Sequence, residues 1–263
     1  MYMIVNLRQN GFGLSYNAGP DADPTAYEPW FDDAGQQLEA LINDGAQVLG
    51  GEPGAGKSHI AADMFQAADA AGMASHMLAS HINAGSMAGR EETQAMLTRT
   101  RDAGEEGLLV IDNFDFMLYT GARKRRRSDA KVREYAGFLG PAVLDCHDAG
   151  CKIVATVHSD EWRDNHSQAP EEAKRYYADL VDNLGGETVF TGAISQANAE
   201  RLLLRREVDP DLAADIAAEL ARVDGLLFRQ AHHINPLVFA EAGIEAAVTA
   251  VNQLRDQKIA GGA

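Results

Sequence analysis

The chain has 263 residues and a formal net charge of −16, with 46% hydrophobic and 24% charged side chains. This composition is typical of an ordinary soluble globule, and the length allows one large domain or a core with a smaller appendage. No apolar run approaches the roughly 20 residues that a membrane-spanning helix needs, and the N-terminus is too polar for a signal peptide. So much negative charge repels nucleic acid, and any contact with DNA or RNA therefore requires a local basic patch.

Cys146 and Cys151 are the only cysteines. Two thiols near an apolar run indicate reduced core residues, without a disulfide framework or a metal cluster. We therefore expect a cytoplasmic protein that does not insert into a membrane.

The first part of the chain contains residues typical of a loop and then a helical pattern. We expect residues 1–31 to form a strand or hairpin followed by a loop rich in Gly, Pro and Asp. Asp32 or Asp33 is suited to cap a helix whose apolar face carries Leu38, Leu41 and Ile42. Residues 46–49 are short and mostly apolar, which predicts a buried strand.

A phosphate-binding loop follows this strand. Its sequence is Gly51-Glu52-Pro53-Gly54-Ala55-Gly56-Lys57-Ser58, which matches the pattern G-x-x-x-x-G-K-S. The glycines let the backbone bring its N–H groups against a phosphate chain. Lys57 is expected between the β- and γ-phosphates, and the Ser58 hydroxyl on Mg²⁺. A helix beginning at His59 would direct its positive end at the phosphates, so we predict that residues 51–59 bind ATP.

Strand and helix patterns alternate after the loop. The further predicted strands cover residues 75–80, 108–112, 152–157 and 188–191. The predicted helices cover residues 59–71, 91–101, 135–144 and 171–184. This alternation predicts a three-layer α/β P-loop core with a parallel sheet over residues 32–193.

From Ser195 onward only helical patterns occur. Ser195 is suited to cap the first helix, and Asp209-Pro210 and Asn235-Pro236 each combine a cap with proline at the first helical position. A short helix is expected after Gly225. We predict a small four-helix lid over residues 194–263.

Asp112 closes the apolar strand over residues 108–112. A buried parallel strand delivers a carboxylate at its C-terminal end, where it can lie beside Ser58. Asp112 and Ser58 are therefore the predicted Mg²⁺ ligands. The alternative is an aspartate that only caps an ordinary strand end.

Asn113 follows, where many ATPases of this type carry a glutamate that polarises the attacking water. An asparagine can orient water but cannot accept its proton as a carboxylate does. Hydrolysis could be slow, another acid such as Asp115 or Glu52 could replace the glutamate, or the protein could bind ATP as a switch. We expect slow but real turnover.

Two further residues are candidates for contact with the γ-phosphate, and the first of them could contact the attacking water instead. His158 ends a predicted strand that should lie next to the phosphate strand, with Thr156 as the competitor on the same strand. Arg229, early in a lid helix, could couple nucleotide state to lid angle. The alternatives are a structural histidine at a strand end and a solvated surface arginine.

The only basic cluster is Arg123-Lys124-Arg125-Arg126-Arg127, with Lys131 and Arg133 nearby. In so acidic a chain the expected counterpart is a phosphate backbone, and residues 123–133 are the candidate DNA contact. A solvated loop or a contact with an acidic neighbouring subunit is the alternative. Residues 86–90 form a predicted loop from which Met87 could grip a threaded polymer, although a plain surface loop is the simpler interpretation.

Together these features resemble the AAA+ ATPases over about residues 30 to 255. Residues 56–61, GKSHIA, look like the G-K-[ST]-H-[LI] run of the replication-initiator, helicase-loader and transposition-helper clade. Residues 109–117, LVIDNFDFM, are similar to that clade's L-x-I-D-D-I-Q-F-L. The resemblance implies ATP and Mg²⁺ as cofactors and assembly into a homo-oligomer. By position it makes His158 the first sensor residue and Arg229 the second.

The chain departs from that family in two places. Asn113 replaces the usual acid. The family's arginine finger is missing from residues 182–187, although Arg163 or Arg175 could act from a different place. We expect no separate DNA-binding domain after the lid.

The leading hypothesis is an AAA+ ATPase that binds and slowly hydrolyses ATP. It would act as an oligomeric helper on DNA or a DNA-bound machine, in helicase loading, plasmid or phage replication, or transposition. One alternative is a protein-remodelling or assembly ATPase, in secretion or virion morphogenesis, with no role on nucleic acid. A packaging or conjugation motor that translocates DNA, and a nucleotide-gated scaffold that never hydrolyses, are the others.

Overall fold

A computed structural model describes much of the chain: residues 39, 41, 43–52, 55–79, 87–115, 129–159, 171–190, 195–223, 231 and 233–260. The chain forms two compact units. The first unit contains residues 1–50, 58–122 and 126–189, and the second contains residues 51–57, 123–125 and 190–263.

The first unit is built on a five-stranded parallel sheet with the order β2-β3-β4-β1-β5. Its strands are β1 (Ala46–Gly51), β2 (Ala74–Ala79), β3 (Gly107–Asp112), β4 (Lys152–His158) and β5 (Glu187–Val189). Every residue of β3 is buried, as its continuous apolar run predicts for a central parallel strand. All five predicted strands are therefore confirmed, with ends that differ by two residues or fewer. The predicted position of β4 next to β1 is confirmed as well.

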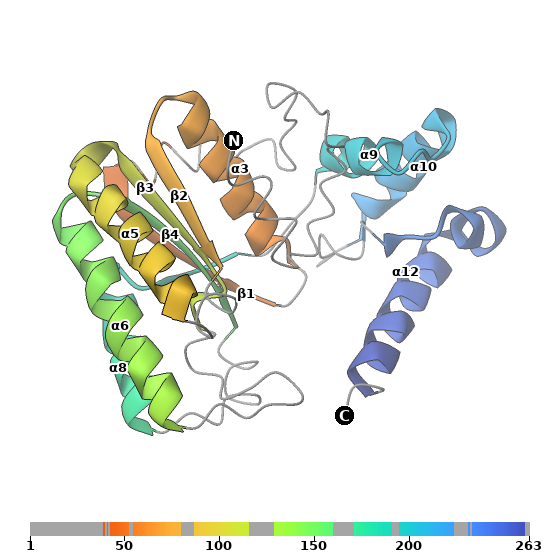
Figure 1. The fold of residues 1–263 in the computed structure, drawn as a ribbon. Helices are drawn as coiled ribbons and strands as arrows, with labels where there is room; N and C mark the ends of the chain where they lie inside the picture. Colours follow the sequence, from red (N-terminus) through yellow and green to blue (C-terminus); the bar gives the residue numbers. More distant parts are fainter. Residues whose placement is uncertain are drawn as a thin grey trace. The chain divides into compact units, whose positions relative to one another are not determined.

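Helices cover both faces of this sheet. They are α3 (Lys57–Ala70), α5 (Met87–Ala103), α6 (Asp129–Asp148) and α8 (Glu171–Asn183), with a short 3-10 turn, η2 (Gly104–Glu106), before β3. Figure 1 shows α5, α6 and α8 on one face and α3 on the other, which makes three layers. The predicted α/β architecture is confirmed.

Three helices begin earlier than the sequence predicts, and α3 does so by two residues, at Lys57. α5 starts at Met87, so the expected loop over residues 86–90 is wrong from its second residue onward. Small residues in this segment suggest a loop, but Met, Ala and Arg are good helix formers and offset the one glycine among them. α6 starts at Asp129, so that Lys131 and Arg133 of the basic cluster lie in its first turns.

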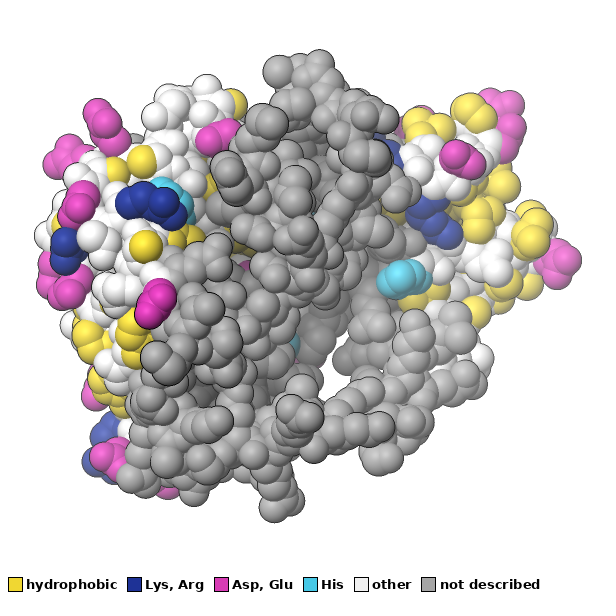
Figure 2. Space-filling model, viewed as in Figure 1, with side chains coloured by type: hydrophobic (Ala, Val, Ile, Leu, Met, Phe, Trp, Pro, Cys, Tyr) yellow, Lys and Arg dark blue, Asp and Glu magenta, His cyan; other side chains and the backbone are white. Residues whose placement is uncertain are grey.

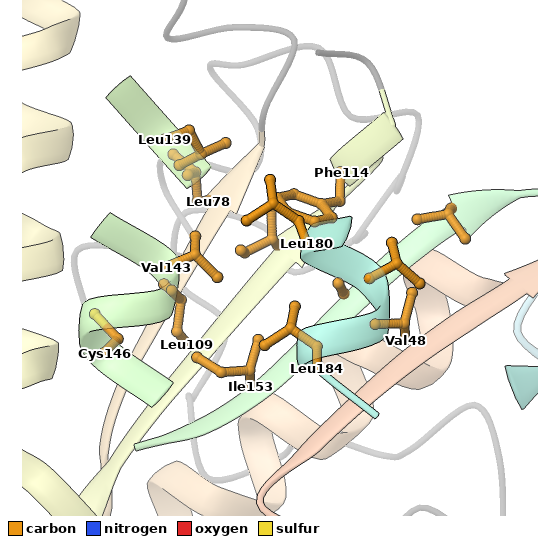
Figure 3. Packing of buried hydrophobic residues seen from close by; sticks show 14 of the residues in the cluster. Val48, Leu78, Leu109, Phe114, Leu139, Val143, Cys146, Ile153, Leu180 and Leu184 are labelled. Atoms are coloured by element: carbon orange, nitrogen blue, oxygen red, sulfur yellow. The ribbon is translucent and has the colours of Figure 1, made fainter. Parts of the chain in front are cut away.

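One core cluster of the first unit lies between the sheet and the helices α5, α6 and α8. Its residues labelled in Figure 3 are Val48, Leu78, Leu109, Phe114, Leu139, Val143, Cys146, Ile153, Leu180 and Leu184. Gly140 lets α6 approach α8, because a Cβ at this position would lie 2.4 Å from the Tyr176 hydroxyl. Cys146 and Cys151 are free and buried, as predicted.

The described helices of the second unit are α9 (Gln196–Leu204), α10 (Pro210–Leu220) and α12 (Pro236–Ala260). All three predicted caps are confirmed. The Ser195 hydroxyl accepts from the Asn198 N–H, and the Asn235 and Asp209 side chains accept from N–H groups in the first turns of their helices.

The ends of two of these helices differ from the sequence prediction. α10 ends at Leu220, three residues before the predicted end at Val223. α12 continues to Ala260, beyond the predicted end near residue 254, and it is kinked where Gly243 adopts φ 78° and ψ −176°. The predicted helix after Gly225 and the predicted hairpin in residues 1–31 lie outside the described residues. Among the described helices, none is both long and apolar enough to cross a bilayer.

Candidate nucleotide-binding site

The predicted phosphate loop joins the end of β1 to the start of α3. Gly51 is required by close approach, because a Cβ there would lie 2.5 Å from the carbonyl oxygen of Phe190. Gly56 has a φ of 97°, which glycine adopts without strain. Ala55 donates its N–H to the Glu52 carbonyl at 3.1 Å, which tightens the bend. Pro53 and Gly54 lie outside the described residues.

Lys57 lies at the first position of α3 with only 7% of its surface exposed. Its Nζ donates to the carbonyl oxygens of Gly51 at 2.6 Å and Glu52 at 3.0 Å. The ammonium group is therefore held against the loop backbone. The first turn of α3, which contains the predicted ligands Ser58 and His59, has no acidic residue to offset the positive end of the helix dipole. This end of the helix suits an anion.

Asp112 ends β3 with 1% exposure. Its Oδ1 accepts from the Ser58 hydroxyl at 2.6 Å and from the Thr156 hydroxyl at 2.7 Å. The structure thus brings together the two predicted metal ligands, Ser58 and Asp112. Among the described residues no group of three or more His, Cys, Asp or Glu could hold a metal by itself. This donor set fits Mg²⁺, which typically uses one or two protein oxygens together with substrate phosphates and water.

Asn113 begins the turn after β3 with a φ of 54°. Its side-chain amide donates to Oδ2 of Asp112 at 2.7 Å, and its backbone N–H donates to the Thr156 hydroxyl at 2.9 Å. The sequence predicts Thr156 only as an alternative to His158 for contact with the γ-phosphate. In the structure Thr156 bridges Asn113 and Asp112. Its buried hydroxyl fixes the orientation of the candidate metal ligand.

Asp115 and His158 form a second polar pair at these strand ends. Oδ2 of Asp115 lies 2.8 Å from Nδ1 of His158 and also accepts the His158 backbone N–H at 3.0 Å. The Asp115 side chain has 0% exposure and that of His158 has 12%. Asp115, one of the two alternative acids, is thus in contact with the candidate sensor residue.

Glu187 is a site residue that the sequence analysis missed. A Cβ on Gly50 would lie 1.7 Å from the Glu187 carboxylate, so this side chain crosses the backbone just before the phosphate loop. The approach depends on the register of β1 and β5, in which Val48 pairs with Glu187. No motif in the sequence predicts that register.

The structure does not test several of the predicted site residues. Arg229, Arg163 and the basic run Arg123, Lys124, Arg125, Arg126 and Arg127 lie outside the described residues. Arg175, the other substitute for an arginine finger, is exposed on α8.

The fold and the strand-end residues define a class of architecture. A parallel sheet with helices on both faces, a glycine-rich loop between β1 and α3, and a carboxylate at the end of β3 are consistent with a P-loop NTPase core.

No protein-family model matches the sequence, and no curated protein matches it either. The solved structures that it resembles include domain III of the Thermotoga maritima replication initiation protein DnaA, at a TM-score of 0.48 and 12% identity, covering 90% of this chain and 96% of that one. A chain of the E. coli MS115-1 HORMA:CdnC:Trip13 complex has a TM-score of 0.46 and 13% identity, with 86% of each chain covered. The replication initiator DnaA bound to AMPPCP and single-stranded DNA has a TM-score of 0.41 and 13% identity, covering 86% of this chain and 65% of that one.

Proposed function

We propose that the chain is an AAA+ ATPase that binds ATP with Mg²⁺ at residues 51–59 and hydrolyses it slowly. The observation that carries this proposal is the 2.6 Å hydrogen bond between Ser58 and Asp112, which joins the end of the phosphate-loop motif to the strand-end acid. In this proposal Ser58 and Asp112 hold the Mg²⁺ ion. When bound, the ion supplies positive charge that offsets the negative phosphates.

The side chains of this site have separate tasks in the proposal. Lys57 transfers its ammonium hydrogen bonds from loop carbonyls to phosphate oxygens, where charge strengthens them. Thr156 and Asn113 hold the Asp112 carboxylate in one orientation. Asn113 cannot accept a proton from water, which accounts for slow turnover.

Replacing Lys57 with alanine tests nucleotide binding and hydrolysis. Loss of a charge-assisted hydrogen bond, about 1.5–3 kcal/mol, should weaken ATP affinity by roughly 10- to 100-fold and reduce phosphate release to background. Affinity is measured by calorimetry with a nonhydrolysable ATP analogue, and turnover by phosphate release.

Lys174→Ala is the matched control, because Lys174 pairs with Glu171 on the surface of α8. It should leave both quantities unchanged. The proposed hydrolysis would be contradicted if the unmutated protein released phosphate no faster than Lys57→Ala does. Unchanged ATP affinity in Lys57→Ala would contradict the loop assignment itself.

The proposed biological role is that of an oligomeric helper on DNA or on a DNA-bound machine. It rests on the resemblance of residues 56–61 and 109–117 to the initiator and helicase-loader clade, and on the basic cluster at residues 123–133. In this proposal Arg229 reports nucleotide state from a C-terminal lid. DNA affinity that survives neutralisation of Arg125, Arg126 and Arg127 would contradict the DNA part.

A role on a protein partner is the second candidate, and the net charge of −16 favours it. The described Lys and Arg side chains form no single continuous patch on the face drawn in Figure 2. Light scattering with ATP, ADP or no nucleotide, each with and without DNA, separates the two candidates. Stimulation of turnover by a protein partner but not by DNA would select the second.

A further inference from the structure

The strand-end cluster contains an acid–base pair, Asp115 and His158, which the metal ligands do not use. One carboxylate oxygen, Oδ2 of Asp115, accepts the backbone N–H of His158 at 3.0 Å and lies 2.8 Å from its ring Nδ1. An ionised carboxylate can only accept hydrogen bonds, so the ring proton lies on Nδ1. The lone pair of the imidazole is then on Nε2, the nitrogen that can take a proton.

The pair is held rigidly. Asp115 follows Phe114, a fully buried ring whose centroid lies 5.9 Å from that of Tyr177 on α8. The Asp115 side chain has 0% exposure, so its negative charge acts at 2.8 Å from the imidazole with little screening by water. A buried carboxylate in this position stabilises the imidazolium that forms when Nε2 accepts a proton.

The other polar groups at the strand ends have different tasks. Both carboxylate oxygens of Asp112 accept hydrogen bonds, from Ser58 and Thr156 on one side and from Asn113 on the other. The amide of Asn113 donates to Asp112 and has no basic atom. His158 is therefore the group in this cluster that is equipped to receive a proton.

We propose that Asp115 is a positioning residue that sets His158 as the proton acceptor for hydrolysis, in place of the acid absent at position 113. The inference rests on the proposed ATP hydrolysis. The oxygen of a water molecule forms a bond to the γ-phosphorus while its proton passes to Nε2. The bond from the γ-phosphorus to the β–γ bridging oxygen breaks, and its electron pair leaves with ADP. The imidazolium then returns the proton to solvent, so the net products are ADP, phosphate and one proton.

His158→Asn is the sharpest test. The asparagine amide nitrogen takes the place of Nδ1 and can still donate to Asp115, but nothing replaces Nε2. The kcat for ATP should fall by about 10²- to 10⁴-fold, the contribution typical of a general base. ATP affinity, measured with a nonhydrolysable analogue, should change by about twofold or less, because the proton acceptor does not bind the ground state.

Asp115→Asn tests the positioning role separately. The His158 backbone N–H favours the amide oxygen at the position of Oδ2, so both contacts with His158 remain while the negative charge is lost. The kcat should fall less than in His158→Asn, by about tenfold. Asp179→Asn on the exposed side of α8 is the matched control, with no change expected. Nitrogen-15 NMR of the His158 ring should show hydrogen on Nδ1 in the unmutated protein and a loss of that preference in Asp115→Ala.

The outcomes separate the inference from the proposed function. Suppose that the unmutated protein hydrolyses ATP faster than Lys57→Ala does, and that His158→Asn has the same kcat as the unmutated protein. The inference then fails while the proposed function stands. A ring proton on Nε2 of His158 would also overturn the inference. If the unmutated protein does not exceed Lys57→Ala, the hydrolytic function fails and takes the inference with it. Equal losses of ATP affinity and kcat in His158→Asn would assign the histidine a structural role, against the proposal.

Discussion

The strand ends of the first unit and the helices of the second differ in where their polar groups lie. Asp112, Asp115 and Thr156 are each at most 1% exposed and are hydrogen-bonded to neighbouring side chains or backbone. Among the described residues of α9, α10 and α12, Asn198 is the only buried polar side chain. A buried carboxylate is destabilising unless it is well paired, and such groups cluster at functional sites, so the contrast supports the proposed site in the first unit. The helices α9, α10 and α12 have buried apolar faces and exposed caps, as expected of structural elements.

Large core truncations should lower the free energy of unfolding by similar amounts in the two units. Such a result would show that the units differ in their buried polar groups and not in their apolar packing. Leu109→Ala in β3 and Leu203→Ala in α9 each remove a side chain with 0% exposure. Each should lower the free energy of unfolding of its own unit by about 2–5 kcal/mol, measured by urea denaturation. Leu237→Ala, at a position with 74% exposure, is the control and should change it by less than about 0.5 kcal/mol. A small loss for Leu109→Ala would mean that the sheet core is loosely packed.

Alkaline pH should distinguish the units, because both cysteines lie in the first. The pKa of the Cys146 thiol is raised from 9.0 to about 12. Burial is the largest cause, and the neighbouring Cys151 is the second. Between these values the unfolded thiol has lost its proton while the folded thiol keeps it, so the unfolded state binds fewer protons and stability falls as pH rises. The expected slope is up to about 1.4 kcal/mol per pH unit from this group.

Urea denaturation of the first unit from pH 8 to pH 10.5 measures this slope, and Cys146→Ala should reduce it. Unfolding of the second unit, which has no cysteine, is the internal reference. A slope that stays the same in Cys146→Ala would show that other groups cause the alkaline loss.

The smallest expected effect concerns a cap in the second unit. Asp209 accepts the N–H groups of Asp211 and Leu212 at 3.1 and 3.2 Å. Asp209→Ala should lower the stability of the second unit by about 1 kcal/mol, seen as a reduced urea midpoint. Asp209→Asn keeps an acceptor oxygen and should be nearly neutral. Equal losses in the two variants would mean that charge, and not the hydrogen bonds, stabilises α10.

Local patterns predict much of this fold, because the interactions behind them are local. The apolar run that ends at Asp112 indicates a buried strand, and Asp209-Pro210 marks a helix start, so both appear where expected. The phosphate loop is a contiguous motif and predicts Lys57, Ser58 and their surroundings. The contact between Ser58 and Asp112 follows from the motif and the parallel strand together.

The rest of the candidate site depends on contacts between distant segments. The bond from Thr156 to Asp112 and the pair of Asp115 with His158 require the register of β3 against β4, which the sequence does not encode in any short pattern. The approach of Glu187 to Gly50 depends in the same way on the register of β1 and β5. The predicted loop over residues 86–90 is wrong because Met87, Ala88 and Arg90 favour a helix, which α5 continues through Gly89.

The backbone of Asn113, at φ 54°, has a consequence for how this sequence can evolve. Asparagine tolerates a left-handed conformation that costs most other residues about 1–2 kcal/mol. A glutamate introduced there would meet that cost, would lose the amide donor to Asp112, and would set a second negative charge beside the first. A glutamate at position 113 would therefore be disfavoured unless the conformation of the turn changed first, so the backbone restricts which side chain can follow Asp112.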